Sequence, residues 1–282
     1  MAATIERIEF HGQPALRLST AAGARAVVAL QGAQVLSWTP PGGEERLYLS
    51  PRALFDGHSA IRGGIPVCFP QFADLGALPA HGFARNRAWT LVTERCGEDF
   101  ALIGLQLADD ADTRAQWPHA FRAELSILIE DSRLDLELEI GNTSDQPFEF
   151  TAALHTYLAV REVEESRIEG LHGFSYRDKT DANRVRRDSG DAVLIEAETD
   201  RVYQDVTRPV LLREYDRSLG INADGFPDVV VWNPWVERSA ALADLPNDGF
   251  RRMLCIEAAA AREPIRLAAG GTWWGRQTLV AL

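Results

Sequence analysis

The segment FRAELSI at residues 121–127 decides the fold class, because its odd positions are apolar and its even positions are polar. After a polar turn at Asp131-Ser132, the alternation returns in LDLELEI at 134–140, now with the apolar residues at even positions. Alternation with period two places one face of a strand on a core and the other face in water. The two segments therefore predict a β-hairpin with a short polar turn.

Segments of the same kind lie on both sides of this hairpin. After a turn at 142–147, a third strand is expected from Phe148 to about Val160. The other expected strands are 26–30, 34–39, 89–94, 101–107, 193–195, 210–214, 229–232, 252–258 and 272–282. Residues 41–85 and 162–190 are interpreted as loops with short turns. Long amphipathic helices are missing, so we expect an all-β chain: one domain, residues 1–282, forming a large sandwich of two sheets with long loops at one rim.

Composition and charge limit the classes of function. The chain has 282 residues, of which 46% are hydrophobic and 25% charged, as is typical of a globular protein with a sizeable core. Its formal net charge of −12 argues against nucleic acid or an anionic membrane as the main partner. The three cysteines are widely spaced and are interpreted as reduced thiols. No apolar run has the length of a signal peptide or of a membrane span, so we expect a cytoplasmic protein.

One irregular segment carries more polar groups than a connecting loop needs. It comprises RGGIPVCFPQF at 62–72 and HGFAR at 81–85, and it contains Arg62, Gln71, His81 and Arg85. Two guanidinium groups in one loop suggest an anion, because their forked N–H groups match the oxygens of phosphate or carboxylate. A long ordered loop whose arginines pair with local carboxylates is an equally open interpretation.

Two polar side chains interrupt otherwise apolar strands. In the third predicted strand, His155 shares a face with Thr151 and Tyr157 and points away from the main hydrophobic layer. Near the carboxyl end, Glu257 shares a face with Cys255 and is flanked by apolar residues, and such desolvation raises the pKa of a carboxyl group and suits it to proton transfer. From the pattern alone, a hydrogen-bonded structural histidine and an ion-paired glutamate remain open alternatives.

Six motifs in a fixed order carry a resemblance to a known family. They are RGGIP at 62–66 with Phe69-Pro70, HGFAR at 81–85, LHTY at 154–157, ETD at 198–200 with Val202-Tyr203, VWNPW at 231–235, and CIE at 255–257. Along nearly its whole length the sequence resembles the aldose 1-epimerase superfamily and, within it, the hexose-6-phosphate mutarotases, also called glucose-6-phosphate 1-epimerases. The resemblance implies a galactose mutarotase-like fold, a large antiparallel β-sandwich with a shallow sugar site on one concave face.

The resemblance also implies roles for individual residues. In that family the histidine corresponding to His155 protonates the ring oxygen of the sugar, and the glutamate corresponding to Glu257 takes the proton from the anomeric hydroxyl. Asp200 would bind sugar hydroxyls, and Gln71 and His81 would be polar contacts of the substrate. Arg62 and Arg85 would bind substrate oxygens and help to hold the phosphate.

The implied reaction opens the sugar ring, rotates about C1–C2 and closes the ring on the other face, with the acid and the base on opposite sides of the ring. Closure reverses the roles of acid and base, so no cofactor and no metal is expected, and the six histidines show no ligand-like clustering. The expected partner is therefore a small sugar phosphate, with glucose 6-phosphate as the expected substrate. The sequence leaves the oligomeric state open, with a monomer slightly favoured.

Other interpretations remain open at this point. The enzyme could act on free sugars, or the chain could be a non-catalytic carbohydrate-binding sandwich. A glycoside hydrolase using Asp200 with Glu257 would leave His155 without a role, and a metal-dependent isomerase would need a histidine cluster. The chain also departs from the family after Glu257, where AAAAR at 258–262 replaces a Pro-Gly or similar break, so the shape of this rim is open.

Overall fold

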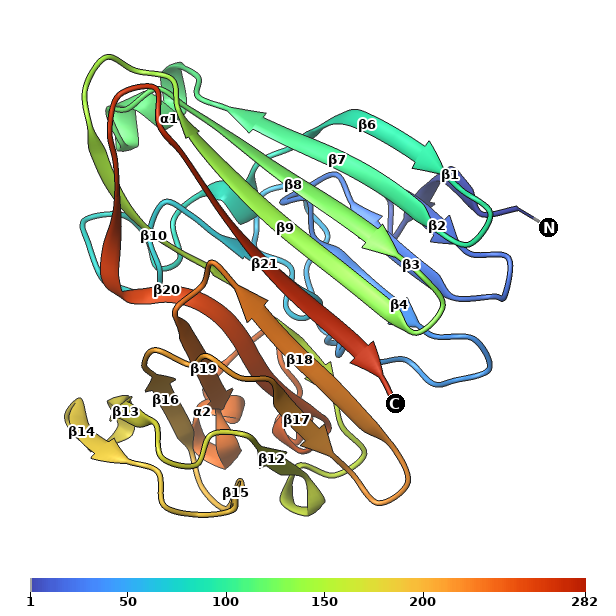
Figure 1. Cartoon of the computed structure of the whole chain (residues 1–282), viewed down its shortest axis with the longest axis vertical. Coiled ribbons are helices and arrows are strands. Elements are labelled where there is room, and N and C mark those ends of the chain that lie inside the picture. Colours follow the sequence, from blue (N-terminus) through green and yellow to red (C-terminus); the bar gives the residue numbers. More distant parts are fainter. Residues whose placement is uncertain (1) are drawn as a thin grey trace.

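The computed structural model describes residues 2–282 and has antiparallel strands in three sheets rather than in the two that we expected (Figure 1). The largest sheet is nine-stranded and contains the predicted hairpin, in which Phe121 pairs with Asn142. In order across this sheet, the strands are β15 (Ala192–Val193), β12 (Arg167–Glu169), β17 (Val210–Arg213), β18 (Ser218–Asp224), β21 (Thr272–Ala281), β9 (Arg133–Asn142), β8 (Phe121–Ile129), β7 (Ala101–Ala108) and β6 (Thr90–Cys96).

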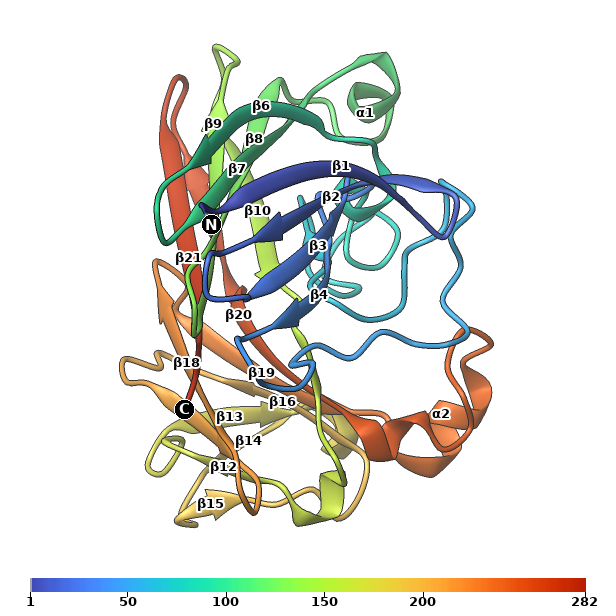
Figure 2. The same cartoon turned by 90° about the vertical axis from the view of Figure 1, so that its right-hand side faces the viewer.

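The second sheet is eight-stranded and provides the floor of the site described below. In order, its strands are β14 (Arg184–Arg187), β13 (Ser175–Asp178), β16 (Thr199–Tyr203), β19 (Asp228–Asn233), β20 (Met253–Leu267), β10 (Phe148–Leu154) and β5 (Val67–Cys68), and β11 (Tyr157–Ala159) also pairs with β20. The third sheet is a four-stranded meander that faces the viewer in Figure 2; its strands are β1 (Thr4–Phe10), β2 (Gln13–Ser19), β3 (Arg25–Ala29) and β4 (Val35–Thr39).

Strand alternation gives the eight-stranded sheet two different faces. On β10 and β20, Leu154 and Ile256 belong to the main hydrophobic core, which contains side chains from all three sheets. Ala153 and Cys255 belong to a smaller cluster on the opposite face. This division confirms the faces predicted from the sequence, and it leaves the second face free to form a polar site.

Helices are short. They are α1 (Ala111–Gln116), α2 (Trp235–Ala241) and four 3-10 turns, η1 (Ala84–Asn86), η2 (Val163–Glu165), η3 (Lys179–Asp181) and η4 (Gly249–Arg252). Within residues 2–282, none of the helices has the length and apolar character needed to cross a membrane.

Three local expectations need correction. The expected third strand is interrupted at His155-Thr156, because β10 ends at Leu154 and β11 begins at Tyr157. The strand expected at 252–258 continues to Leu267. The interpretation of 162–190 as loop is wrong, since β12, β13 and β14 lie there. β14 has the sequence RVRR with every residue exposed, so it carries no alternation of buried and exposed positions that could reveal it.

Candidate active site

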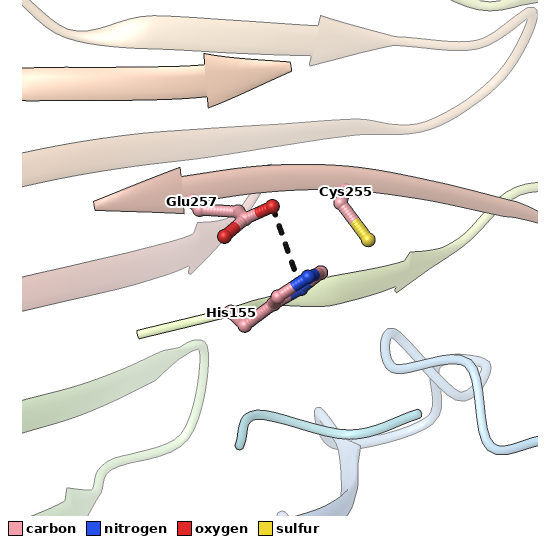
Figure 3. Close-up of side chains that lie close together, drawn as sticks. All are labelled: His155, Cys255 and Glu257. Carbon is pink, nitrogen blue, oxygen red and sulfur yellow. Dashed lines mark ion pairs between the residues drawn. The ribbon is translucent and has the colours of Figure 1, made fainter. Parts of the chain in front are cut away.

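His155 and Glu257 lie side by side on the second face of the eight-stranded sheet (Figure 3). Glu257 projects from β20, and His155 follows the end of β10, the neighbouring strand. The Nδ1 atom of His155 is 3.4 Å from Oε1 of Glu257, although the alignment does not make a hydrogen bond. The side chains are almost fully buried, with 7% of His155 and 1% of Glu257 exposed. Each retains an atom without a hydrogen-bond partner, Nδ1 of His155 and Oε2 of Glu257.

Burial sets the charge of this pair. It lowers the pKa of His155 well below the usual range, and the nearby charges of Arg85 and Arg62 lower it further. Burial likewise raises the pKa of Glu257 well above the usual range, helped by the charge of Asp200. In the free protein the proton of the pair therefore resides on the carboxyl group. This differs from the expected imidazolium and carboxylate, but the number of protons held by the pair is the same.

A cavity of about 720 Å³ opens above the pair. His155, Glu257, Arg62, His81, Arg85 and Asp200 all line it, so the fold brings together six of the seven site residues named from the sequence. Those residues come from segments as distant as 62 and 257, which shows that the motifs converge on one face of the sheet.

The loop at 62–85 holds its polar groups by close backbone contacts. A side chain at Gly63 would collide with the backbone oxygen of Tyr48, and one at Gly64 with that of Val35, so the two glycines allow Arg62 to approach the neighbouring segments. The guanidinium of Arg62 donates to Asp244 at 3.1 Å and to the hydroxyl of Tyr157 at 2.9 Å. Arg62 is thus largely committed to protein partners.

His81 lies beside the pair of His155 and Glu257, with a defined tautomer. Its Nδ1 atom accepts the Ala73 N–H at 3.4 Å and lies 3.1 Å from Sγ of Cys68, which leaves Nε2 to carry the ring proton. Its ring centroid is 5.2 Å from that of His155. Burial lowers the pKa of His81 to about 3, so the ring is neutral.

Gln71 is the predicted contact that the structure places elsewhere. Its amide nitrogen donates to the carbonyls of Ala73 and Leu78, and its oxygen accepts the Leu78 N–H, each at 3.0 Å. The side chain is absent from the described cavity lining, and its hydrogen-bonding groups close the loop 71–78. We therefore interpret Gln71 as a residue that positions His81.

Several cations of the cavity were missed by sequence reasoning. Arg177 lies on β13 and Lys179 begins η3, in the region interpreted as loop, and Arg238 and Arg262 also line the cavity. The signal that could have identified one of them is composition, because Lys179 is the single lysine among 29 basic residues. Its Nζ atom is 3.7 Å from Oδ1 of Asp200 and 5.2 Å from the ring centre of Phe72.

The segment after Glu257 is regular β-strand, because β20 continues through the alanines at 258–261. The buried carboxylate of Asp228 accepts the backbone N–H groups of Ala261 and Arg262 at 3.0 and 2.9 Å. Ala261 and Arg262 line the cavity. The small side chains of this segment leave room above the sheet, and Asp228 fixes its backbone.

One group of side chains in the described part of the chain has donor atoms suited to a metal. The ligand atoms of His155, Cys255 and Glu257 all lie within 4.8 Å of one another. Two of these three residues, His155 and Glu257, are also the pair expected to transfer protons.

Comparison with known proteins agrees with this architecture. The family described as aldose 1-epimerase matches residues 14–279. A protein of Cenchrus ciliaris named "Putative glucose-6-phosphate 1-epimerase" is 37% identical over 267 residues, which cover 91% of this chain and 81% of that protein. An Escherichia coli K12 protein of the same name is 35% identical over 243 residues, covering 85% and 81% respectively.

Solved structures give the same result for the fold. The crystal structure of a protein from Salmonella typhimurium, titled a "putative mutarotase", superimposes with a TM-score of 0.91 at 28% identity and covers 98% of this chain and 93% of that one. The chain thus has the fold of a sugar isomerase. It belongs to the aldose 1-epimerase family, the mutarotases.

Proposed function

We propose that this mutarotase interconverts the α and β anomers of a hexose 6-phosphate, with glucose 6-phosphate as the expected substrate. The names of its relatives suggest this substrate. The main support for this substrate is the charge of the cavity lining. The lining is positive, whereas the formal net charge of the whole protein is negative.

Six cations line the cavity: Arg62, Arg85, Arg177, Lys179, Arg238 and Arg262. The acidic residues of the lining are Asp74, Asp200 and Glu257, so cations exceed acids by three in a protein whose formal net charge is −12. A local excess of this kind attracts a small anion despite the global charge, because screening limits the distant charges more than the near ones.

Two of these arginines are available to a ligand. Within residues 2–282, Arg85 and Arg177 have no carboxylate within 4.0 Å, whereas Arg62, Arg238 and Arg262 pair with Asp244, Glu198 and Asp205. Arg85 uses one N–H on the carbonyl of Ala80, and its Nε is buried without a partner. A phosphate would satisfy these donors two at a time, and we assign the phosphate to Arg85 and Arg177, with Arg62 in support.

His155 and Glu257 are proposed to act together as the acid–base pair, with the single proton of the free pair on Glu257. Ring opening adds a proton at the ring oxygen and removes one from the anomeric oxygen, and both oxygens are bonded to C1. Because the two oxygens share one carbon, two proton-transfer groups whose atoms lie 3.4 Å apart can serve both oxygens from the same side of the sugar, in place of the opposite sides expected from the sequence. A pair that holds one proton can give it to one oxygen while taking another from the second, so the cycle restores the pair.

Asp200 is the proposed contact for sugar hydroxyls. Burial raises the pKa of its carboxyl group, while the charge of Lys179 acts in the opposite direction. The ion pair with Lys179 thus favours a carboxylate in the cavity, and a carboxylate accepts hydrogen bonds from two hydroxyls.

The test is anomer exchange measured by NMR on glucose 6-phosphate and, in parallel, on free glucose. We expect the protein to accelerate exchange of the phosphorylated sugar at far lower substrate concentration. Equal kcat/KM for the two sugars would assign the enzyme to free aldoses. An absence of acceleration for both, with binding retained, would leave only carbohydrate binding.

A further inference from the structure

We propose that His155, Cys255 and Glu257 form a Zn²⁺ site, and that Zn²⁺ bound there inhibits the enzyme by occupying its acid–base pair. The binding does not depend on the identity of the sugar, whereas the loss of rate rests on the function proposed above. The three donor atoms lie close together, and two of the side chains carry a buried polar atom without a hydrogen-bond partner.

The three side chains converge because of strand geometry. Cys255 and Glu257 are two residues apart on β20, so they project from the same face, and His155 lies opposite both (Figure 3). Their ligand atoms lie within 4.8 Å of one another, and Nδ1 of His155 is 3.4 Å from Oε1 of Glu257. Tetrahedral zinc with its usual bond lengths separates its ligands by about 3.3–3.6 Å, so the thiol needs to approach by on the order of 1 Å.

Two buried atoms of this cluster lack hydrogen-bond partners, and this is evidence independent of the distances. Nδ1 of His155 and Oε2 of Glu257 have no hydrogen-bond partner, although more than nine-tenths of each residue is buried. Buried polar atoms are normally paired, because an unpaired one loses its interaction with water without compensation. A cation between the two side chains would satisfy both atoms.

The donor set selects the kind of metal. Thiolate and imidazole are ligands that Zn²⁺ prefers, while Mg²⁺ and Ca²⁺ prefer an all-oxygen set. Binding replaces the proton of the Cys255 thiol, and that of the Glu257 carboxyl group where present, and the protons pass to solvent. Thiolate and carboxylate then balance the two charges of the ion. His155 and Glu257 line the cavity, which gives the ion a route of entry and an open fourth position for water.

Bound zinc would remove both proton-transfer groups from the reaction. The metal takes the Nδ1 lone pair of His155 and the charge of Glu257, so neither atom can exchange a proton with the sugar. We therefore expect Zn²⁺ to inhibit the enzyme. Added substrate that is free of metal should not relieve this inhibition at once, whereas a chelator should reverse it.

The experiment uses metal-free protein and two matched thiol variants, Cys255→Ala and Cys68→Ala. Cys255 and Cys68 are both fully buried on the same sheet, but Cys68 faces His81 and is outside the proposed ligand set. Zn²⁺ should inhibit the native protein and Cys68→Ala alike. Inhibition of Cys255→Ala should need at least ~100-fold more Zn²⁺, since losing a direct ligand costs more than the 10–100-fold typical of an outer-shell partner. Mg²⁺ is the control ion.

Co²⁺ supplies a readout that does not depend on activity. The native protein with Co²⁺ should show a sulfur-to-cobalt charge-transfer band that persists in Cys68→Ala and is absent in Cys255→Ala. A native protein that gives no such band has no metal–thiolate bond, and the site is then refuted even if the variants fold poorly. A band without inhibition would retain the site and refute the inhibition. Loss of activity in EDTA that Zn²⁺ restores would show a required metal, and would also overturn the inhibitory role.

Discussion

The Nδ1 atom of His155 lies 3.4 Å from Oε1 of Glu257, in a pair that is almost fully buried at the floor of a cation-lined cavity. Burial acts in opposite directions on the two pKa values, lowering that of the imidazole and raising that of the carboxyl group. The pair therefore keeps a single proton over the pH range between its two macroscopic pKa values. This is the state that a reversible proton exchange at one sugar carbon requires.

His155→Asn should fold normally and lose ~10²–10⁴-fold in kcat, the usual effect of removing a positioned acid–base group. The asparagine keeps a polar side chain at a position that packs against Tyr157, with ring centroids 4.7 Å apart in the native protein. The rate is followed by NMR exchange or polarimetry, and folding by circular dichroism. A folded variant with a near-native rate would remove His155 from the mechanism.

Glu257→Gln should abolish anomer exchange while leaving binding of glucose 6-phosphate largely intact. Glutamine keeps the size of the side chain but can neither donate nor accept the proton, and Asp200 and the arginines remain to hold the ligand. Calorimetry measures the binding. The native enzyme should show a bell-shaped dependence of kcat/KM on pH, whose limbs report the two pKa values of the pair. Undiminished exchange in the variant would refute the acid–base assignment.

The same variant should be more stable than the native protein, by an amount that grows with pH. A group whose pKa is raised on folding contributes stability below its unfolded pKa, and this contribution is lost as pH rises, because the unfolded chain releases the proton first. The slope is at most about 1.4 kcal/mol per pH unit. Thermal melts at several pH values should show Tm values that converge near pH 4 and diverge above it. A difference in Tm that is independent of pH would show that Glu257 ionises normally in the folded protein.

Arg85→Ala and Arg177→Ala should each raise KM for glucose 6-phosphate much more than KM for glucose. A charge-assisted hydrogen bond contributes about 1.5–3 kcal/mol, which corresponds to roughly 10–150-fold. Arg187→Ala is the matched control, because Arg187 is exposed on the adjacent β14 and is not among the lining residues. Arg62→Ala is less specific, since it also leaves the buried hydroxyl of Tyr157 without its partner. Equal effects on the two sugars would assign Arg85 and Arg177 to the ring or to the loop.

The sequence predicted the parts of this protein that depend on local patterns. Alternation at 121–127 and 134–140 gave β8 and β9 nearly to their ends, and the faces of His155 and Glu257 followed from the same rule. The resemblance then suggested their roles, which alternation could not provide. Local patterns failed where hydrogen bonds inside an irregular loop decide which way a side chain points. Gln71 sits in a motif beside His81, yet its hydrogen bonds go to Ala73 and Leu78.

Arg177 and Lys179 could not be predicted as cavity residues from the local sequence either. β13 and β14 form a short hairpin at the edge of the eight-stranded sheet, and tertiary pairing with β16 rather than an apolar pattern holds it in place. Nothing in the local sequence indicates that Arg177 and Lys179 approach residues near 62, 155 and 257. Only the pairing of the sheet brings these segments to one cavity.

Lys179 gives a chemical test of this arrangement, because it is the single lysine of the chain. An amine-reactive acetylating reagent should modify Lys179 and the terminal amine only. Acetylation removes the charge beside Asp200, whose Oδ1 atom is 3.7 Å from Nζ in the native protein, so activity should fall in step with modification of Lys179. Glucose 6-phosphate should slow both the acetylation of Lys179 and the loss of activity, and glucose at the same concentration should slow neither. In Lys179→Arg, which keeps the charge and lacks the amine, the reagent should label the terminal amine without inactivating the enzyme. Full activity after complete acetylation of Lys179, shown by peptide mass spectrometry, would show that the charge of this lysine is not needed for activity.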